Sequence, residues 1–305
     1  MNTALPYRSP AALRAALTER LKRLSASSPF TVTELYRQFA YDRLLTRVFT
    51  SDDAQRWILK GATALLARLD VARHSKDIDL ARQSTADLDE TEAAFRTAAG
   101  RDVHDFFLFD VGPATPLVGD KGRRLAVVAI LGGRPFAEFS ADIVTAESLT
   151  GQPDPVPPLV QLGIPGLLTV AYRAYPLVDH IADKIAACIE SHPHDGVTTV
   201  STRYKDMVDL VLIARSQRPH AENLRQAIRH QAVSRGIDLP IAFSSPGPLW
   251  TAGYEAKAAE VADIGDLGRF APALALVKRF LDPVLNGTGT GEWNPARSRW
   301  TGGNT

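Results

Sequence analysis

Two aspartates separated by one residue, Asp77 and Asp79, are the side chains whose type and spacing most clearly suggest chemistry in this sequence. Residues 77–80 are typical of a strand, in which side chains alternate between two faces. Both carboxylates would then lie on one face, and Ile78 would point into the core. Adjacent carboxylates repel each other unless a cation or a proton lies between them. The pair therefore predicts a site for Mg²⁺ or Mn²⁺, and the alternative is a solvated turn at the end of a strand.

A third carboxylate, Asp142, follows in a predicted hairpin. Residues 125–131 (LAVVAIL) and 136–144 (FAEFSADIV) are β-rich runs separated by a Gly-Gly turn signal. The second run places Asp142 near the end of a strand, with Phe139 on the opposite face. One acid in this position is what a site for two metal ions would need in addition to the first pair.

The sequence Gly61-Ala62-Thr63 predicts a tight turn between a strand at residues 57–60 and a short helix. Backbone N–H groups at the start of a helix, together with the hydroxyl of Thr63, would bind a phosphate group. Lys76, beside the aspartate pair, is a further expected nucleotide contact. Turns of this composition also occur without any ligand, so the prediction depends on the acids that follow.

Two predicted helices farther along the chain carry a lysine and two acids. Residues 177–190 and 203–215 have the apolar spacing of helices. Lys184 lies on the first helix, and Asp206 and Asp209 lie three apart on one side of the second. Lys184 would bind nucleotide phosphates as a positive charge, and Asp209 would hold it in position. The alternative is that these are ordinary solvated side chains on helix surfaces.

The remaining patterns predict an α+β fold, with a small mixed sheet, flanking helices and a C-terminal helical region. Further helices are expected at residues 9–24, 86–99, 221–235, 251–262 and 271–282 and from Thr31 or Thr33, and a strand at residues 106–110. Residues 152–158 (QPDPVPP) are too rich in proline for a helix and predict a linker. The predicted parts are N-terminal helices packing on the core (1–50), the core (51–151), a helical domain that contributes Lys184 and Asp209 (159–285) and a flexible tail (286–305).

Composition excludes several classes of protein. No apolar run approaches the roughly 20 residues that span a bilayer, and residues 1–10 lack the pattern of a signal peptide, so we expect a cytoplasmic protein with no membrane contact. Cys188 is the single cysteine, which excludes an intrachain disulfide and a cysteine-based zinc site. We expect this thiol to pack inside a helix rather than to act in catalysis.

Five runs resemble, in this order, the AbiEii family of nucleotidyltransferase toxins, which includes the mycobacterial MenT toxins and belongs to the superfamily of DNA polymerase β: LKGATALLARL, RHSKDIDL, FSADIV, HIADKIAA and RYKDMVDL. The resemblance implies a polymerase-β-like core in which Gly61 and Thr63 contact the nucleotide and the three aspartates hold metal. Lys184 and Asp209 would serve the same site, in a cleft between core and helical domain. The sequence departs from its relatives at Ala62, where they typically have a second glycine, and this methyl group narrows the approach to phosphate.

The resemblance also implies a function. It implies a toxin of a toxin–antitoxin or phage-defence system that transfers a nucleoside monophosphate from an NTP with Mg²⁺. For the mycobacterial members the acceptor is the 3′ end of tRNA, and pyrimidine nucleotides, notably CTP, are preferred. An AbiEi-like antitoxin would be the protein partner, and we expect a monomer. The alternatives are transfer to a small molecule or a protein side chain, and a binding module that keeps the fold without the chemistry.

Basic and aromatic side chains provide candidate RNA contacts. Residues 1–50 contain eight Lys or Arg and three acids, a net charge of +5, whereas residues 51–110 carry −4. The individual candidates are Arg123, Arg124, Arg134 and Arg173, with Tyr172 and Tyr175 for stacking on bases. The alternative is that the arginines are solvated or open a strand and that the tyrosines pack under a loop.

Ser75 is a candidate regulatory phosphosite. It lies two residues before Asp77, so a phosphate there would add about −1.5 to −2 charges beside the carboxylates and would compete with the triphosphate of an incoming NTP. Nucleotide transfer should then stop. The alternative is that Ser75 only caps a turn.

Overall fold

The computed structural model describes residues 5–69, 73–83, 87–117, 121–146, 149–190, 192–194, 197–245 and 247–302. The chain forms two compact units. Unit 1 comprises Met1–Arg68, His74–Ser148 and Pro153–Tyr175, and unit 2 comprises Leu69–Arg73, Leu149–Gln152 and Pro176–Thr305. The boundary differs from the predicted linker at residues 152–158, because Asp154–Val156 within it and Tyr172–Ala174 beyond it are both strands of the sheet of unit 1.

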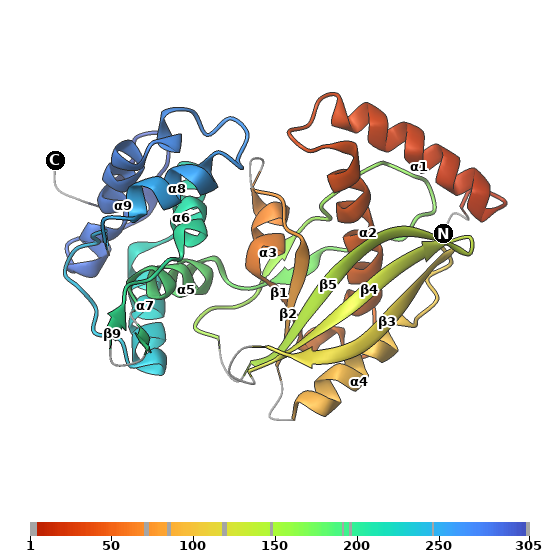
Figure 1. Ribbon diagram of the computed structural model, residues 1–305, viewed down its shortest axis with the longest axis horizontal. Coiled ribbons are helices and arrows are strands. Elements are labelled where there is room, and N and C mark those ends of the chain that lie inside the picture. The colour runs from red at the N-terminus through yellow and green to blue at the C-terminus, as the bar shows by residue number, and fades with distance from the viewer. Residues whose placement is uncertain are drawn as a thin grey trace. The chain divides into compact units, whose positions relative to one another are not determined.

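Unit 1 is built on a mixed sheet of seven strands in the order β3-β4-β5-β2-β1-β7-β6 (Figure 1). The strands are β1 (Trp57–Lys60), β2 (Asp77–Gln83), β3 (Phe107–Pro116), β4 (Arg123–Leu131), β5 (Arg134–Ala146), β6 (Asp154–Val156) and β7 (Tyr172–Ala174). β2 pairs in parallel with β5 and antiparallel with β1. The predicted mixed sheet is therefore present, with β2 and β5 at its centre.

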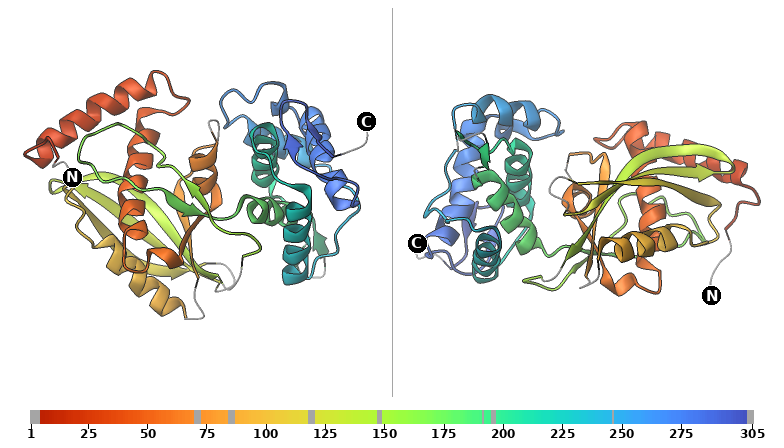
Figure 2. Two further views of the ribbon diagram at one scale, coloured as in Figure 1. Left: turned by 180° about the vertical axis from the view of Figure 1, so that it is seen from behind. Right: turned by 60° about the horizontal axis from the view of Figure 1, so that its bottom comes forward.

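Four α-helices and one 3-10 helix accompany this sheet in the described part of unit 1. They are α1 (Pro10–Ser25), α2 (Val32–Phe49), η1 (Ala54–Arg56), α3 (Gly61–Arg68) and α4 (Leu88–Ala99). Thr31 and Glu34 close a capping box at the start of α2, which is why the helix begins there. α2 and α4 both pack against β5 (Figure 1 and Figure 2). Leucines of α1, aromatic residues of α2 and α4 and one face of the sheet form a single hydrophobic core.

The strands alternate as the sequence predicted. On β2, Ile78 and Leu80 are buried in the core, whereas Asp77 and Asp79 are half-exposed on the other face. On β4 the buried residues likewise alternate with more exposed ones, beginning at Leu125. The sheet therefore has one apolar face under the helices and one face that carries the acids.

The hairpin of β4 and β5 contains the predicted Gly-Gly turn and one bulge. Gly132 and Gly133 both have positive φ values, of 60° and 73°, which suits a two-residue hairpin turn. The register then shifts between Ala129 and Ile130, where Phe136 is the extra residue on β5. The preceding Pro135 has no N–H to donate, and the ring of Phe136 packs among core aromatics. Beyond the bulge, Arg124 rather than Arg123 lies opposite Asp142.

Unit 2 is mainly helical. Its described elements are α5 (Leu177–Ile189), β8 (His192–His194), β9 (Val197–Thr199), α6 (Tyr204–Ser216), α7 (Ala221–Arg235), α8 (Trp250–Ala258), η3 (Gly265–Gly268), α9 (Phe270–Leu285), β10 (Trp293–Asn294) and β11 (Arg299–Trp300). The predicted helices all occur within a few residues of their expected bounds. In the described parts of both units, none of the helices has the length and apolar content to cross a membrane.

The predicted flexible tail is instead a folded hairpin over most of its length. Trp293 and Trp300 are paired across β10 and β11 and are both buried. Their indole N–H groups donate to Ala214 and Phe280 carbonyls at 2.7 and 3.0 Å. The ring of Trp300 stacks on Phe280 of α9. Two large aromatic side chains thus offset the Gly- and Thr-rich composition that predicted disorder, and residues 303–305 lie outside the described part.

Candidate active site

Asp77, Asp79 and Asp142 lie on one face of two adjacent strands of unit 1. Asp79 on β2 is directly paired with Asp142 on β5, and Asp77 is two residues away on the same face. In-register neighbours on adjacent strands bring side chains into contact range, so three acids share a small region of the sheet. The pattern predicted from the sequence, with Asp142 as the third carboxylate, is therefore compatible with the strand register.

Arg124 provides the counter-charge for these acids. Its Nε and Nη2 donate to Oδ1 and Oδ2 of Asp142 at 2.7 and 2.6 Å, a two-pronged ion pair. The same guanidinium lies 3.7 Å from Asp77 Oδ2. The bond to Asp142, supported by the charges of Asp77 and Asp79, holds the pKa of Arg124 well above its usual value. The acid face thus attracts a positive charge, which in this structure is the guanidinium of Arg124.

The donor chemistry of the acid face fits a hard divalent cation, because Mg²⁺ and Mn²⁺ prefer carboxylate oxygens. Within the described residues, however, no three His, Cys, Asp or Glu side chains are already gathered in a metal-binding arrangement. Asp142 is not arranged to bind a metal ion because both of its carboxylate oxygens accept hydrogen bonds from the Arg124 guanidinium. The residues fit a metal ion in type and position, provided that Asp142 exchanges Arg124 for the metal.

Gly61 lies directly against Asp79. Its φ value is 62°, in the left-handed region that favours glycine, and a Cβ atom at this position would overlap the Asp79 carboxylate. Lys60, the preceding residue, is the antiparallel partner of Asp79. The strand must therefore turn into α3 at a point where no side chain fits, and the sequence signal for a tight Gly turn is confirmed.

The neighbouring predicted contacts have mainly structural bonds. Thr63 is fully buried and its hydroxyl donates to the Asp77 carbonyl at 2.7 Å, so this hydrogen is committed to the start of β2. Ala62 is also buried, whereas Lys76 is exposed. Ser75 is buried, and its hydroxyl lies 2.9 Å from both the carbonyl and Oδ1 of Asp77. Both hydroxyls thus hold Asp77 in place, and both come from residues that precede it in the sequence.

Lys184 belongs to unit 2 and is held in a buried charge network. Its ammonium donates to Asp209 at 2.6 Å and to Asp206 at 3.2 Å. Burial disfavours the charged ammonium, but the two carboxylates outweigh it and raise the Lys184 pKa. Asp209 thus holds Lys184 as the sequence predicted. Arg73 also pairs with Asp209, at 3.1 Å, and Arg203 pairs with Asp206 at 2.6 Å.

The outer edge of this network lines a small cavity of about 180 Å³. Four basic side chains line it together with a single acid, Asp206: Arg73, Arg203, Lys205 and Lys257. Such a lining favours an anionic group of the size of a phosphate. The buried thiol Cys188 lies beneath the network, where burial raises its pKa, so it is an unreactive packing residue as predicted.

Most of the predicted RNA contacts have internal partners. Arg123 pairs with Asp89 and Glu92 of α4, and Tyr172 is fully buried and donates to Asp42. Tyr175 is also buried, beneath the ammonium of Lys60. In the basic N-terminal segment, Arg43 and Arg47 are buried against Asp105. Arg134 is exposed and Arg173 is half-buried. Burial therefore contradicts the stacking role of the two tyrosines and leaves few cations free among these candidates.

Sequence reasoning missed two arginines of these clusters. Arg124 was assigned to RNA, because its pairing with Asp142 depends on a bulge that the sequence did not indicate. Arg73 received no role, although it lies four residues before Asp77 in a run of mixed charge. A systematic search for basic residues on the strand next to Asp142 would have found the first.

Comparison with known proteins gives one family and a recurring fold. The sequence model of the family described as "Nucleotidyl transferase AbiEii toxin, Type IV TA system" matches residues 43–300. No curated protein matches the chain in a sequence search. Among solved structures, the nucleotidyltransferase toxin MenT4 of Mycobacterium tuberculosis is similar at 16% identity and a TM-score of 0.50, over 90% of this chain and 98% of its own. A Helicobacter pylori protein assigned as a nucleotidyltransferase is similar at 15% identity and a TM-score of 0.48, over 85% of this chain and 98% of its own.

Proposed function

We propose that this chain, which belongs to the AbiEii family of nucleotidyltransferase toxins, transfers a nucleoside monophosphate from CTP to the 3′ end of tRNA and so blocks translation. Its family is that of a type IV toxin–antitoxin system, so the chain has an antitoxin partner, which we propose to be AbiEi-like. As a nucleotidyltransferase it uses an NTP and a divalent metal ion. In this proposal the metal is Mg²⁺ and the protein acts in the cytoplasm, where its tRNA acceptor is found.

The observation that carries the proposal is the placement of Asp77, Asp79 and Asp142 on one face of adjacent strands. These three carboxylates would hold the divalent cation, which when bound offsets the negative charge of the triphosphate. Gly61 supports the same role, because it brings the backbone at the start of α3 against the Asp79 carboxylate. N–H groups at the start of a helix favour a phosphate. Acids and helix start together form a site for a metal-bound nucleotide.

The chain's own residues also determine the alignment of this site. Ser75 and Thr63 fix Asp77 through its carboxylate and its carbonyl, so its orientation does not depend on substrate. Arg124 keeps the acids neutralised until an NTP arrives, and in this proposal it then turns to the triphosphate, which is the stronger anion. Lys184 and Asp209 remain the pair assigned to the nucleotide by family resemblance, and Lys76 remains an exposed candidate contact.

Labelled nucleotides test the proposal directly. The protein is incubated with MgCl₂ and each α-³²P-labelled NTP in turn, with unfractionated tRNA in one series and without RNA in another. We expect label on tRNA, mainly from CTP, and none after addition of EDTA. Label on the protein in the second series would instead favour modification of a protein side chain. Label in neither series would contradict nucleotide transfer to either acceptor.

A matched pair of variants tests the assignment of the site. Asp79→Ala removes a carboxylate from the acid face and should abolish labelling. Asp110→Ala removes an exposed carboxylate from β3 of the same sheet and should leave labelling unchanged. Labelling by Asp79→Ala at the rate of the unmodified protein would show that the acid face is not the catalytic site.

A further inference from the structure

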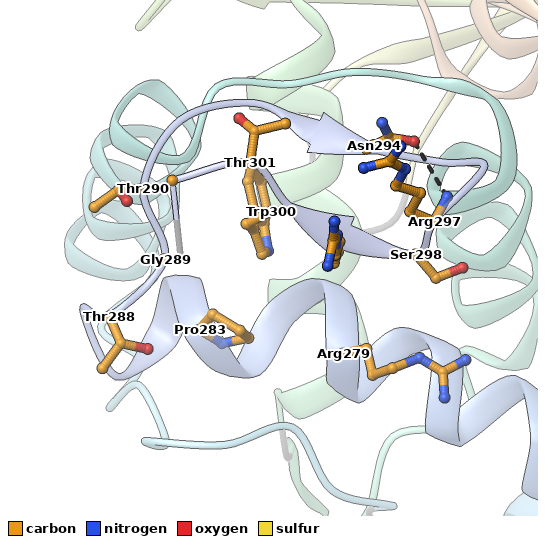
Figure 3. A pocket seen from close by; sticks show the side chains of 12 residues that line it. Arg279, Pro283, Thr288, Gly289, Thr290, Asn294, Arg297, Ser298, Trp300 and Thr301 are labelled. Carbon is orange, nitrogen blue, oxygen red and sulfur yellow. Dashed lines mark hydrogen bonds between the residues drawn. The ribbon is translucent and has the colours of Figure 1, made fainter. Parts of the chain in front are cut away.

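The C-terminal hairpin and α9 of unit 2 enclose a basic cavity of about 880 Å³ (Figure 3). Three arginines line it: Arg279 of α9, and Arg297 and Arg299 of the turn and the β11 strand of the hairpin. All three are exposed, and no ion pair joins any of them to another described residue. The described lining contains no Asp or Glu. The cavity is therefore a concentration of positive charge without internal compensation.

Five further residues of the lining carry polar groups of the kind that contact phosphate oxygens. Side-chain hydroxyl or amide groups come from Thr288, Thr290, Asn294, Ser298 and Thr301. Hydroxyl, amide and guanidinium donors are the side chains that most often contact nucleic-acid phosphates and sugars. Trp300 points from the hairpin toward α9 and is only 6% exposed, so it forms a wall rather than a stacking platform (Figure 3). The chemistry suits a sugar–phosphate backbone more than bases.

The walls of the cavity are firmly built. Trp300 donates to the carbonyl of Phe280 at 3.0 Å, which ties the hairpin to α9. The ends of the hairpin are joined by a bond from the Gly302 N–H to the Thr290 carbonyl at 3.1 Å, and a side chain at Gly302 would overlap Thr290. The arginines consequently extend from an ordered frame, and a ligand meets them without first ordering the segment.

We propose that this cavity binds the phosphate backbone of the acceptor RNA, which deepens the proposed function and rests on it. The arginines that sequence reasoning assigned to RNA include Arg123 and Arg124, whose charges are neutralised by acids of unit 1. Those of the cavity are not neutralised. Its volume is several times that of one phosphate group, and its cations come from both a helix and a hairpin. The site therefore suits successive phosphates of a chain, recognised without regard to base sequence.

Binding of fluorescein-labelled unfractionated tRNA, measured by anisotropy over a series of NaCl concentrations without NTP, tests this inference. The variant Arg297→Gln/Arg299→Gln removes two charges at exposed positions. We expect its affinity to fall on the order of ten-fold near physiological salt and the salt slope to decrease by about 1 to 2, since each lost phosphate contact removes roughly 0.7 to 0.9 from the slope. Arg279→Gln, on the other wall, should act in the same direction.

The matched control is Arg218→Gln/Arg229→Gln, which removes the same charge from exposed positions of unit 2 outside the cavity lining. It should leave both affinity and slope unchanged. Equal weakening by the control would overturn the inference, because binding would then follow net charge alone. Unchanged tRNA binding in the cavity variants would also overturn the inference. If the cavity variants bound tRNA normally but no longer bound CTP, the cavity would be a nucleotide site and the inference would likewise be wrong.

This test separates the inference from the proposed function, because it contains no NTP. Label transferred to tRNA at the normal rate by cavity variants that bind tRNA normally would overturn the inference and leave the proposed function standing. Weakened tRNA binding with a reduced salt slope in the cavity variants, combined with a wild-type protein that labels no RNA, would support the RNA site and overturn the transferase proposal.

Discussion

Gly61 lies so close to the carboxylate of Asp79 that a single methyl group at position 61 would occupy the same space. The two residues belong to the antiparallel pair β1 and β2, and the chain leaves β1 for α3 at this point. One relationship thus connects the turn, the start of a helix and an acid of the candidate active site. It also gives the most direct way to disturb the site without touching a charged group.

Gly61→Ala should lower nucleotide transfer by about a hundred-fold or more, because displacement of a reacting group by about 1 Å has effects of this size. Gly133→Ala is the matched control, since Gly133 also has positive φ but no atom within 4 Å of the added methyl group. Both variants should lose about 1 to 2 kcal/mol of stability from the left-handed backbone, and Gly61→Ala should lose more because Asp79 must also move. Steady-state transfer and urea unfolding measure the two effects. Equal activity of the two variants would argue against contact with Asp79 as the cause.

Arg124→Gln should bind Mn²⁺ more tightly than the unmodified protein in the absence of nucleotide. Removal of the guanidinium leaves Asp142 without its counter-charge, so a metal ion no longer competes with Arg124 for this carboxylate. We therefore expect the affinity for Mn²⁺ to rise by about ten-fold. Electron paramagnetic resonance of free Mn²⁺ measures this without any reaction. Arg123→Gln is the control, because its acids lie on α4. Weaker binding by Arg124→Gln would show that Arg124 does not compete with metal.

Lys184→Ala should destabilise the protein by about 3 to 5 kcal/mol, because the buried carboxylates of Asp206 and Asp209 would each lose an ion-pair partner. Lys205→Ala, at an exposed position of α6, should change stability by less than about 0.5 kcal/mol. Urea unfolding followed by tryptophan fluorescence provides the values. A stable Lys184→Ala protein without activity would instead assign Lys184 to the reaction alone.

Asp42 should make stability fall as pH rises from about 4 to 6. Burial raises the Asp42 pKa to about 6, although the bonds from Tyr172 and from the N–H groups of Leu159 and Val160 favour the charged form. In the unfolded chain the pKa is about 3.9, so folding takes up a proton in this window, and about 3 kcal/mol present below pH 4 is lost by pH 6 and above. Asp42→Asn cannot titrate, so its stability deficit relative to the unmodified protein should shrink as pH rises. A deficit independent of pH would contradict this.

Ser75→Glu should stop nucleotide transfer, as a phosphate at this position would. Ser75 is 1% exposed and bonds to Asp77, so the substitution adds both charge and volume beside the acids. Ser75→Gln separates the two, because it has the same volume without the charge. Transfer by the Gln variant but not by the Glu variant would identify charge as the cause. Full activity of Ser75→Glu would remove Ser75 as a regulatory position.

Much of the fold and part of the site follow from local sequence patterns. Alternation on β2 separates Asp77 from Ile78, and glycine alone fits the turn at position 61. Bonds between distant segments are not visible in this way. Tyr172 was expected to stack on RNA but is buried against Asp42, a partner 130 residues away. The C-terminal hairpin was missed for a related reason, since Trp300 is ordered by the packing surface that α9 supplies.

The bulge at Phe136 decides which of the adjacent residues Arg123 and Arg124 faces Asp142. With the register of the turn continued unbroken, Arg123 would lie opposite Asp142 and Arg124 would turn to the side of α4. Deletion of Phe136 would instead keep Arg124 opposite Asp142, because the pairs on the two sides of the extra residue would then follow one another directly. The arginine that faces Asp142 is thus set by the number of residues between the turn and each partner, because a shift of one residue in register moves a side chain to the other face of the sheet.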